Sequence, residues 1–406
     1  MTGAAMGGMV LAPNVILAGD QAAQKSAKKI RIGVVGGGFG CAFYWHEHPN
    51  CVVQAVSDLR EDRRKALVDT YKCGNVYPSL EELIKDKDVD AVAVFTGAPD
   101  HVPHALKCLA AGKHVISAVP ACQTVAEAEE LLAAVKKTGL TYMMAETSYY
   151  NQSVISARKW FEEGKFGNVF YMEAQYHHMA GPAELRQLAW WNGKPTWRYG
   201  GSPMGYPTHC LGRALGVTGG RMKTVSCLGT RTYVNPGDKE MHTGNRYHNP
   251  FTNEAALFQT QDGNMCRVTI FWRGSSPSNE YGAWYGEKMS FFGHNPLGTP
   301  RYLVTRSAGQ TELDDAGFPH QLAQREEYKV PDWWATDMLP ESMRHGGGHD
   351  GSQTFLTHEF IDALTHDRKP AVDIYESLAY TVPGIIAHES ALAGGKEMKV
   401  PSFDPA

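Results

Sequence analysis

The sequence predicts an α/β protein in which a doubly wound parallel sheet precedes a second α/β domain with a mostly antiparallel, open sheet. Three observations predict it. Residues 30–58 read as a strand, a glycine turn and a second strand that ends in an acidic residue. Apolar strands then alternate with capped helices up to about residue 145. Longer strands follow, with an Asp-Gly-Asn hairpin turn at 262–264, and this texture is typical of antiparallel sheets.

The first segment is a dinucleotide-binding fingerprint in the strand–turn–helix context that the motif requires. Asp58 lies 20 residues after Gly38, where a carboxylate binds the ribose hydroxyls of NAD and repels the 2′-phosphate of NADP. Arg60 weakens that preference, because an arginine pairs with a 2′-phosphate. We therefore expect NAD as cofactor, with its pyrophosphate at the start of a helix. The turn residues expected to contact it are Gly36, Gly38, Phe39 and Gly40.

Capping signals delimit the helices of the first domain. Ser79 with Glu82, and Thr124 with Glu127, form two capping boxes. Strands are expected at 90–95, 113–117 and 141–145. In the second half, the expected elements are a helix at 153–163, strands at 169–178, 224–233, 254–261, 265–272, 288–293 and 301–305, and helices at 353–367 and 374–392. We place an NAD-binding Rossmann domain at 29–148 and a substrate and oligomerisation domain at 149–406, with C-terminal helices that pack back.

Residues 1–28 stand apart as an export-signal-like or disordered tail. Residues 4–19 are small and apolar, and 17–19 resemble the approach to a cleavage site, although no Lys or Arg precedes them. This favours an exported, periplasmic protein, with a cytoplasmic location as the alternative.

Composition excludes several classes of function. The net charge is −4 without a basic stripe, so no nucleic-acid partner is expected. No apolar run reaches the roughly 18 residues of a membrane span. The eight cysteines are scattered without a C-x-x-C pair, which indicates neither a zinc site nor a disulfide framework. We expect a homo-oligomer, either a dimer or a tetramer.

The chain resembles the Gfo/Idh/MocA oxidoreductase family over about residues 29–404. The motifs that carry the resemblance are the fingerprint at 32–41 and the segments 99–104, 112–115 and 163–167. Members of this family combine a Rossmann domain with an α/β domain and act on sugars, inositols and related polyols with a nicotinamide cofactor. The resemblance implies a carbohydrate substrate and cofactor contacts from Pro99, His101, His104 and His114.

Two departures from the family pattern concern the proton chemistry. The family usually carries Glu-Lys-Pro where this chain has Ala118-Val119-Pro120, so the lysine that assists proton transfer is absent. The usual Asp-x-x-x-His segment retains His209 but has Gly205 in place of the aspartate. Oxidation of an alcohol needs a base for the hydroxyl proton, and two usual candidates are missing.

One branch of the family, the NAD-dependent glycosidases of the α-N-acetylgalactosaminidase type, lacks the same lysine. This chain shares its Tyr-x-His, Tyr-Pro-Thr-His and His-Gly-Gly segments, at 176–178, 206–209 and 345–347. In that branch, NAD oxidises the C3 hydroxyl, the acidified C2 proton leaves, the leaving group is eliminated, water adds and the hydride returns. The resemblance implies catalytic roles for His209, Tyr206, His178 and Tyr176. For Tyr176 and His178, a structural role is an equal alternative.

Further candidates lie where the sheet edge and a glycine-rich loop face the cofactor. Tyr149 and Tyr150 follow the sixth strand, where they contact substrate or simply pack. His345 and His349 lie in a glycine-rich loop that suits substrate better than metal, because no third clear ligand accompanies them; no metal is expected. Of the seven tryptophans between residues 190 and 334, one or two are expected to stack on a sugar ring.

These observations predict an NAD-dependent oxidoreductase that acts on a sugar or glycoside by hydride transfer at a ring hydroxyl carbon, C3. If the protein is exported, where free NAD is scarce, the cofactor must be retained and recycled. The alternatives are a redox-neutral glycoside hydrolase or lyase that works by oxidation, elimination and addition, and a non-catalytic NAD-binding sensor.

Overall fold

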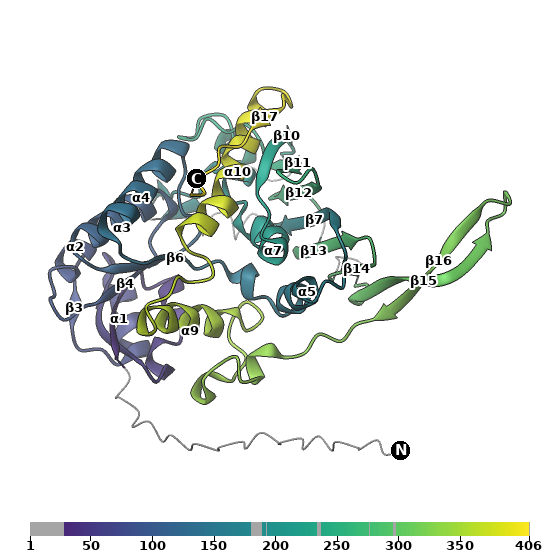
Figure 1. Cartoon of the computed structure of the whole chain (residues 1–406). Helices are drawn as coiled ribbons and strands as arrows, with labels where there is room; N and C mark the ends of the chain where they lie inside the picture. The colour runs from purple at the N-terminus through teal and green to yellow at the C-terminus, as the bar shows by residue number, and fades with distance from the viewer. Residues whose placement is uncertain are drawn as a thin grey trace, which may run out of the picture.

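A computed structural model describes residues 28–179, 189–191, 193–233, 237–275, 277–294 and 298–405. Two sheets organise them, a parallel one in the N-terminal third and a mostly antiparallel one after it (Figure 1). This arrangement confirms the predicted fold class. The export-like segment 4–19 lies outside the described residues.

The N-terminal sheet is parallel throughout, in the order β3-β2-β1-β4-β5-β6. Its strands are β1 Ile30–Val35, β2 Cys51–Ser57, β3 Val76–Tyr77, β4 Ala91–Val94, β5 His114–Ser117 and β6 Tyr142–Met144. The helices of this part are α1 Glu61–Tyr71, α2 Leu80–Leu83, α3 His101–Ala110 and α4 Val125–Thr138. Both predicted capping boxes form, since the Ser79 and Thr124 side chains accept hydrogen bonds from the backbone N–H groups of Glu82 and Glu127. The strand order reverses between β1 and β4, and ligands bind at such a switch point.

The second sheet has nine strands within the described residues, in the order β16-β15-β14-β13-β7-β12-β11-β10-β17. Neighbouring strands are antiparallel except for β7 and β12. The strands are β7 Val169–His177, β10 Met222–Thr230, β11 Asn253–Thr260, β12 Met265–Phe271, β13 Asn279–Gly286, β14 Met289–Phe292, β15 Tyr302–Leu313, β16 Pro319–Glu327 and β17 Met398–Lys399. A short pair, β8 Trp190–Trp191 and β9 Lys194–Pro195, lies apart from it.

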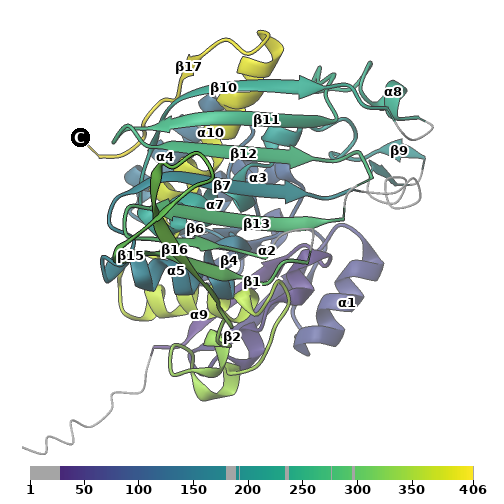
Figure 2. The ribbon, with the colours of Figure 1, turned by 90° about the vertical axis from the view of Figure 1, so that its right-hand side faces the viewer.

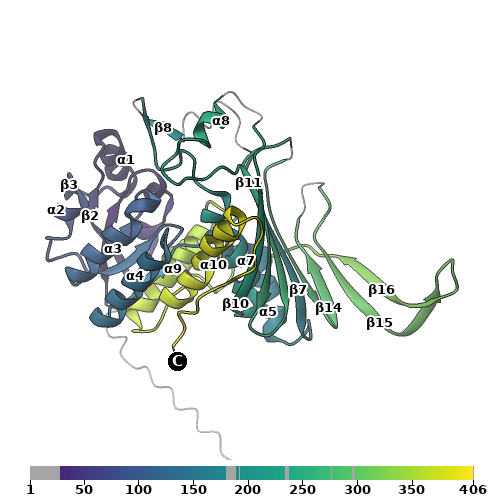
Figure 3. The same ribbon diagram turned by 90° about the horizontal axis from the view of Figure 1, so that it is seen from above.

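Helices fill the space between the two sheets. They are α5 Gln152–Glu162, α7 Thr208–Thr218 and α10 Ile374–Leu392 beside the large sheet, and α9 Ser352–Thr365 against the parallel sheet (Figure 3). Figure 2 looks onto the opposite face of the large sheet, which no helix of the described chain covers. The hairpin of β15 and β16 extends away from the body of the molecule (Figures 1 and 3). A short helix, α8 Asp238–Met241, lies near β8 and β9 at the edge of the interdomain space (Figures 2 and 3).

The helix expected directly after the glycine turn is absent from the described structure. In its place are two 3-10 segments, Phe39–Ala42 and Trp45–Glu47. Phe43 and Trp45 are both buried and stacked on one another, with ring centroids 5.6 Å apart. Side chains two positions apart point to different faces of an α-helix, so burying both rings disrupts a regular helix here. A pyrophosphate bound at this turn therefore meets the N–H groups of a glycine turn rather than an α-helix N-terminus.

Several elements of the second half differ from the predicted ones. The predicted strand at 301–305 is the start of the much longer β15, which pairs with the unpredicted β16. Strand β13 was not predicted, because Gly282 and Gly286 lower its β-propensity. Gly282 nevertheless has a structural reason, since a Cβ there would lie 3.0 Å from the ring of Trp284. Helix α7 was not predicted either, and it carries His209.

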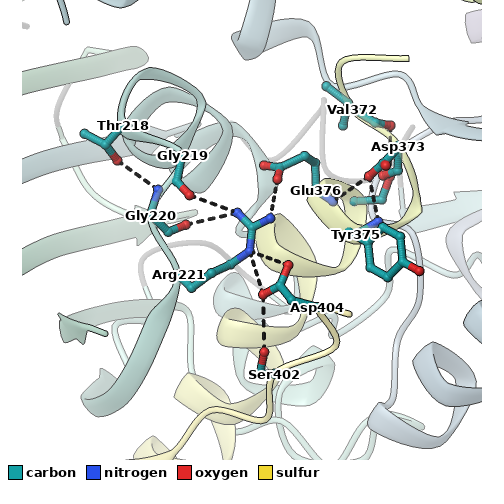
Figure 4. A network of polar contacts seen from close by, with 11 residues as sticks. Thr218, Gly219, Gly220, Arg221, Val372, Asp373, Tyr375, Glu376, Ser402 and Asp404 are labelled. Carbon is teal, nitrogen blue, oxygen red and sulfur yellow. Dashed lines mark hydrogen bonds and ion pairs between the residues drawn. The ribbon is translucent and has the colours of Figure 1, made fainter. Parts of the chain in front are cut away.

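Arg221 holds the C-terminal segment in place through hydrogen bonds and ion pairs (Figure 4). The guanidinium donates to Glu376 at the start of α10 and to both carboxylate oxygens of Asp404 at 2.9 Å. It also donates to the carbonyl oxygens of Gly219 and Gly220, at 3.3 and 3.2 Å. Because a guanidinium has five N–H donors in a rigid fork, one side chain ties α7, α10 and the chain end together.

Among the helices of the described ranges, none is long and apolar enough to cross a membrane. All eight cysteines lie in these ranges and are unpaired, and seven of them are buried.

Candidate functional site

The cofactor end of the site is the glycine turn between β1 and β2. Gly36 has a positive φ of 103°, and a Cβ there would lie 2.2 Å from the Phe95 carbonyl oxygen, so glycine is required. Gly38 is the exposed glycine of the turn; a Cβ there would meet only the guanidinium of Arg63, at 3.7 Å. The turn thus leaves its backbone accessible to a ligand where the strand order reverses, and such a position suits the pyrophosphate of a dinucleotide.

Asp58 is fixed against this turn. Its Oδ2 atom accepts a hydrogen bond from the Gly37 N–H at 2.8 Å, and its Oδ1 atom accepts one from the Arg60 N–H at 2.8 Å. A carboxylate has about four acceptor positions, so two ribose hydroxyls can still bind. The Arg60 guanidinium pairs with Asp62 at 2.5 Å. These contacts fit NAD held through its adenosine ribose.

The histidines predicted to contact the cofactor lie away from this turn. His114 begins β5 and accepts a hydrogen bond from the Thr141 N–H at 3.0 Å. It therefore lies at the amino edge of the sheet, and its predicted place at the cofactor edge was wrong. Both ring nitrogens of His101 face carbonyl oxygens, those of Pro120 at 2.7 Å and Thr96 at 3.2 Å, which leaves none for NAD.

The remaining residues of that motif have mixed positions. His104 lies 3.1 Å from the hydroxyl of Thr96 and does not line the cavity described below. Pro99 also lies outside the lining, although the adjacent Ala98 and Thr96 contribute to it. The segment 99–104 thus determines the conformation of the loop after β4, and its two histidines form hydrogen bonds within that region.

A cavity of about 510 Å³ joins the glycine turn to the second domain. The parallel sheet contributes Phe39, Phe95, Val119 and Pro120, and the second domain contributes Tyr176, His178, Tyr206, His209 and Trp272. All four predicted catalytic residues therefore line one cavity, together with the loop that carries the predicted turn residue Phe39. The two positions that depart from the family pattern, Val119 and Gly205, line it as well.

A buried carboxylate that the sequence did not single out stands behind His209. The Nδ1 atom of His209 lies 2.7 Å from Oε1 of Glu146, and both side chains are buried. Burial opposes the charged imidazole, but the charge of Glu146 and its hydrogen bond outweigh that effect, so the pKa of His209 is raised. The pKa of the Glu146 carboxyl is lowered, because His209 more than offsets its burial. This pair fixes the imidazole orientation and leaves Nε2 for the cavity.

Two aromatic rings contact His209. Tyr176 stacks on it with ring centroids 4.8 Å apart, and Tyr206 meets it edge-on at 5.2 Å. Tyr176 also stacks on His178 at 5.5 Å and meets Trp272 edge-on at 5.6 Å. Burial raises the pKa of both tyrosines, so both phenols remain protonated and can donate or relay a proton.

The two histidines of the glycine-rich loop have different surroundings. His349 lines the cavity beside Phe39, with ring centroids 5.8 Å apart, and its Nδ1 atom lies 3.2 Å from the side-chain nitrogen of Gln353. Partial burial and the charge of His209 lower the pKa of His349. His345 instead pairs with Glu47 at 2.5 Å and lies outside the cavity lining. Of this predicted pair, only His349 is placed to meet a ligand.

Tyr149 and Tyr150 take the packing role. Tyr150 is buried and stacks on Phe355 with ring centroids 5.3 Å apart. The ring of Tyr149 lies 3.9 Å from the Arg158 guanidinium. Neither lines the cavity, so the substrate contact predicted for them is not seen.

Among the described residues, no group of three or more His, Cys, Asp or Glu side chains is arranged to hold a metal ion. The cavity residues that the sequence did not single out are Glu146 behind the wall and, in the lining, Gln123, Arg198, His242, Tyr247 and Arg273. Two of the predicted tryptophans, Trp197 and Trp272, face the cavity.

Comparisons with known proteins fit this geometry. Residues 30–146 match the GFO_IDH_MocA family, described as an oxidoreductase family with an NAD-binding Rossmann fold, and residues 309–405 match the glycosyl hydrolase 109 C-terminal domain. Glycosyl hydrolase family 109 proteins of Streptomyces coelicolor and Bacteroides thetaiotaomicron are 23% and 22% identical to the chain, each over 92% of it and over 83% and 84% of their own length.

The fold also resembles that of scyllo-inositol dehydrogenase from Lactobacillus casei, solved with NAD(H) and scyllo-inositol. Its TM-score is 0.67 at 16% identity, over 92% of this chain and 99% of that one. The chain is therefore an NAD-dependent enzyme of the Gfo/Idh/MocA oxidoreductase type. It combines an NAD-binding Rossmann domain that matches this oxidoreductase family with a segment that matches the glycosyl hydrolase 109 C-terminal domain.

Proposed function

We propose that the protein cleaves a glycoside in a redox-neutral cycle with bound NAD. The observation that carries the proposal is the buried pair of Glu146 and His209 with Tyr176 and Tyr206 around one cavity. The glycosyl hydrolase 109 match and the names of the relatives support it. When bound, NAD supplies a reversible acceptor for the hydride of a ring carbon, which we place at C3.

His209 takes the proton of the sugar hydroxyl at the carbon that loses hydride. In its neutral form, Nε2 is a free base, because Glu146 accepts from Nδ1–H. Glu146 then stabilises the imidazolium that forms, so the raised pKa favours proton uptake from the hydroxyl. The resulting C3 ketone acidifies the C2 proton.

Tyr176 and His178 are assigned to the C2 proton, because their stacked rings lie beside His209 in the same wall. Loss of the C2 proton expels the C1 substituent, whose oxygen takes up one proton. We assign the phenol of Tyr206, which lines the same cavity, as the donor of that proton. Water then adds its oxygen to C1 and gives one proton to the Tyr206 phenolate, while the base at C2 returns its proton to C2. Return of the hydride to C3 and of the proton to its hydroxyl completes the cycle without net oxidation.

The test is to purify the protein without added cofactor, read its nicotinamide absorbance and incubate it with a glycoside panel in D₂O. The proposal requires glycoside cleavage without added NAD, no net NADH, and one deuterium at C2 of the released sugar. Stoichiometric NADH with a keto-sugar and no deuterium at C2 would make the protein a plain dehydrogenase. Bound NAD with no turnover on any glycoside would leave a sensor.

Homo-oligomerisation also stays a proposal. Leu228, Leu257 and Met265 are 64%, 50% and 46% exposed, and their strand registers place them on one face of the large sheet. This is the face without helices in Figure 2, and apolar side chains gathered on one exposed face are typical of interfaces. Light scattering on the purified protein distinguishes a monomer from a dimer or tetramer. Export remains a prediction. It is tested by determining the N-terminal residue of the mature native protein and the cell compartment in which that protein is found.

A further inference from the structure

The cavity lining carries a set of basic side chains. Within the described residues, the lining contains no aspartate and no glutamate. It contains two arginines and four histidines: Arg198, Arg273, His178, His209, His242 and His349. A site for an uncharged sugar commonly uses carboxylates or amides to accept hydrogen bonds from hydroxyls, and here Gln123 is the amide of the described lining.

The two arginines differ in how their charge is balanced. Arg273 donates from Nε to Oδ1 of Asp238 at 2.8 Å, and both side chains are only 2% exposed. Its charge is therefore neutralised inside the protein. The Arg198 guanidinium lies over the ring of Trp197, 4.3 Å from its centroid, and 5.9 Å from that of Tyr206. No carboxylate of the described chain forms an ion pair with it.

The two acidic side chains whose charges act on His209 already have basic partners. Glu146 binds His209, and Glu280 pairs with Arg213 at 2.5 Å. The position where the family usually has an aspartate is Gly205, directly before Tyr206, over whose ring Arg198 lies. A Cβ at Gly205 would be 2.6 Å from the Ser202 hydroxyl, which occupies that space. Arg198 thus faces the cavity without the acidic neighbour that this segment usually supplies.

We propose that the sugar bound in this cavity carries an anionic oxygen group, a carboxylate or a sulfate ester, and that Arg198 pairs with it. A guanidinium held on an aromatic ring presents its fork of N–H donors edge-on, which matches two oxygens of one anionic group. Trp197 and Trp272 offer apolar faces for the sugar ring. The inference rests on the proposed action on a glycoside and specifies the chemical class of that substrate.

The experiment measures binding of matched sugar pairs to the NAD-loaded protein by calorimetry. Methyl glucuronides and galacturonides are compared with the corresponding methyl glucosides and galactosides, and 6-sulfated N-acetylhexosamines with their unsulfated forms. The anionic member should bind roughly 10- to 100-fold more tightly, as expected for a charge-assisted hydrogen-bond pair. The uronide and sulfate arms distinguish the two anionic groups. Equal affinity within the pairs that bind would overturn the proposal.

Arg198→Gln should reduce the affinity ratio within each pair to near one, and Arg198→Lys should retain part of it. Arg246→Gln is the matched control, because Arg246 is also exposed and lies over a ring, 4.9 Å from the centroid of Tyr247, but does not line the cavity. It should leave the ratio unchanged. An unchanged ratio in Arg198→Gln, or an equal loss in both variants, would refute the assignment. Binding is read without turnover, so failure of the glycosidase cycle does not affect the result.

Discussion

The imidazole of His209 and the carboxylate of Glu146 form a buried pair, 2.7 Å between Nδ1 and Oε1, although they come from different domains of the chain. Glu146 follows β6 at the carboxyl edge of the parallel sheet, and His209 lies in the first turn of α7. A Cβ on Gly212 would lie 2.7 Å from the Glu146 side chain. The absence of that atom lets α7 approach closely enough for the pair to form.

Glu146→Gln should lower turnover roughly 10²- to 10⁴-fold, as for loss of a general acid–base function. Glu146 raises the pKa of His209 against its burial, so the variant should shift the rate limb that reports His209 to lower pH. The rate as a function of pH is the measurement. Glu254→Gln is the control, because Glu254 is also fully buried and binds a histidine, His388, at 2.7 Å outside the cavity lining. Glu254→Gln should lower the melting temperature without shifting the His209 limb of the pH–rate profile. An equal shift of that limb in both variants would contradict the role assigned to Glu146.

Asp58→Ala should weaken NAD binding by roughly 10-fold or more, because a charged acceptor of ribose hydrogen bonds is lost. It should also narrow the preference over NADP, since the repulsion of the 2′-phosphate disappears. Fluorescence titration with both dinucleotides measures the two affinities. Asp69→Ala is a suitable control, because Asp69 is exposed and pairs with Lys65 on α1 away from the glycine turn. A wild-type protein that binds NADP as tightly as NAD would show that Asp58 does not select the cofactor.

Replacing the two histidines of the glycine-rich loop should give different results. His349→Ala should lower kcat/KM roughly 10-fold, the size expected for a hydrogen bond to a ligand, because this ring faces the cavity. His345→Ala should leave kcat/KM close to that of the wild type and lower only the stability, because it removes the contact with Glu47. Steady-state kinetics and thermal unfolding together separate the two effects, and equal kinetic losses would mean that the loop acts as a whole.

Acid should weaken the contact between the β1–β2 connection and α9 near His48. Its Nε2 atom lies 3.0 Å from Nδ1 of His358, and burial followed by the charge of His358 lowers the pKa of His48 to about 4. The unfolded chain binds this proton at a pH near 6.5, so the contribution is complete above that pH and is lost as the pH falls toward 4. The loss should reach roughly 2–3 kcal/mol. Urea unfolding from pH 7 to pH 4 measures it, and His48→Gln should make that stretch of the curve flatter.

Much of the site was predictable because its parts are local. Gly36, Asp58 and the segment that ends in His209 are each recognised from a few neighbouring residues, and all four predicted catalytic residues line the cavity. Glu146 was not predicted, because a glutamate after a short strand has no distinguishing pattern until α7 packs against it. Arg198 was not predicted either. Its proposed role depends on the lack of an ion pair with any carboxylate of the described chain, which the sequence does not reveal.

The errors in the fold have similar physical causes. The two segments after the glycine turn are not an α-helix, because tertiary packing of Phe43 and Trp45 overrides the motif. Helix α7 includes Gly212 and Gly216, which lower helix propensity but allow close contact with Glu146 and Tyr149. His114 was misplaced because the family segment around it marks a strand start, and the edge of the sheet follows only from the topology.

The acid-free lining of the described cavity also has a pharmacological consequence. Many glycosidases cleave with two carboxylates that face the glycosidic bond, and protonated iminosugars inhibit such enzymes because their ammonium group pairs with those carboxylates. Here the described lining carries Arg198 and no carboxylate, so it offers an ammonium group no such partner. Compounds of that class should therefore be poor inhibitors of this protein, and anionic or neutral sugar mimics should be the better starting points.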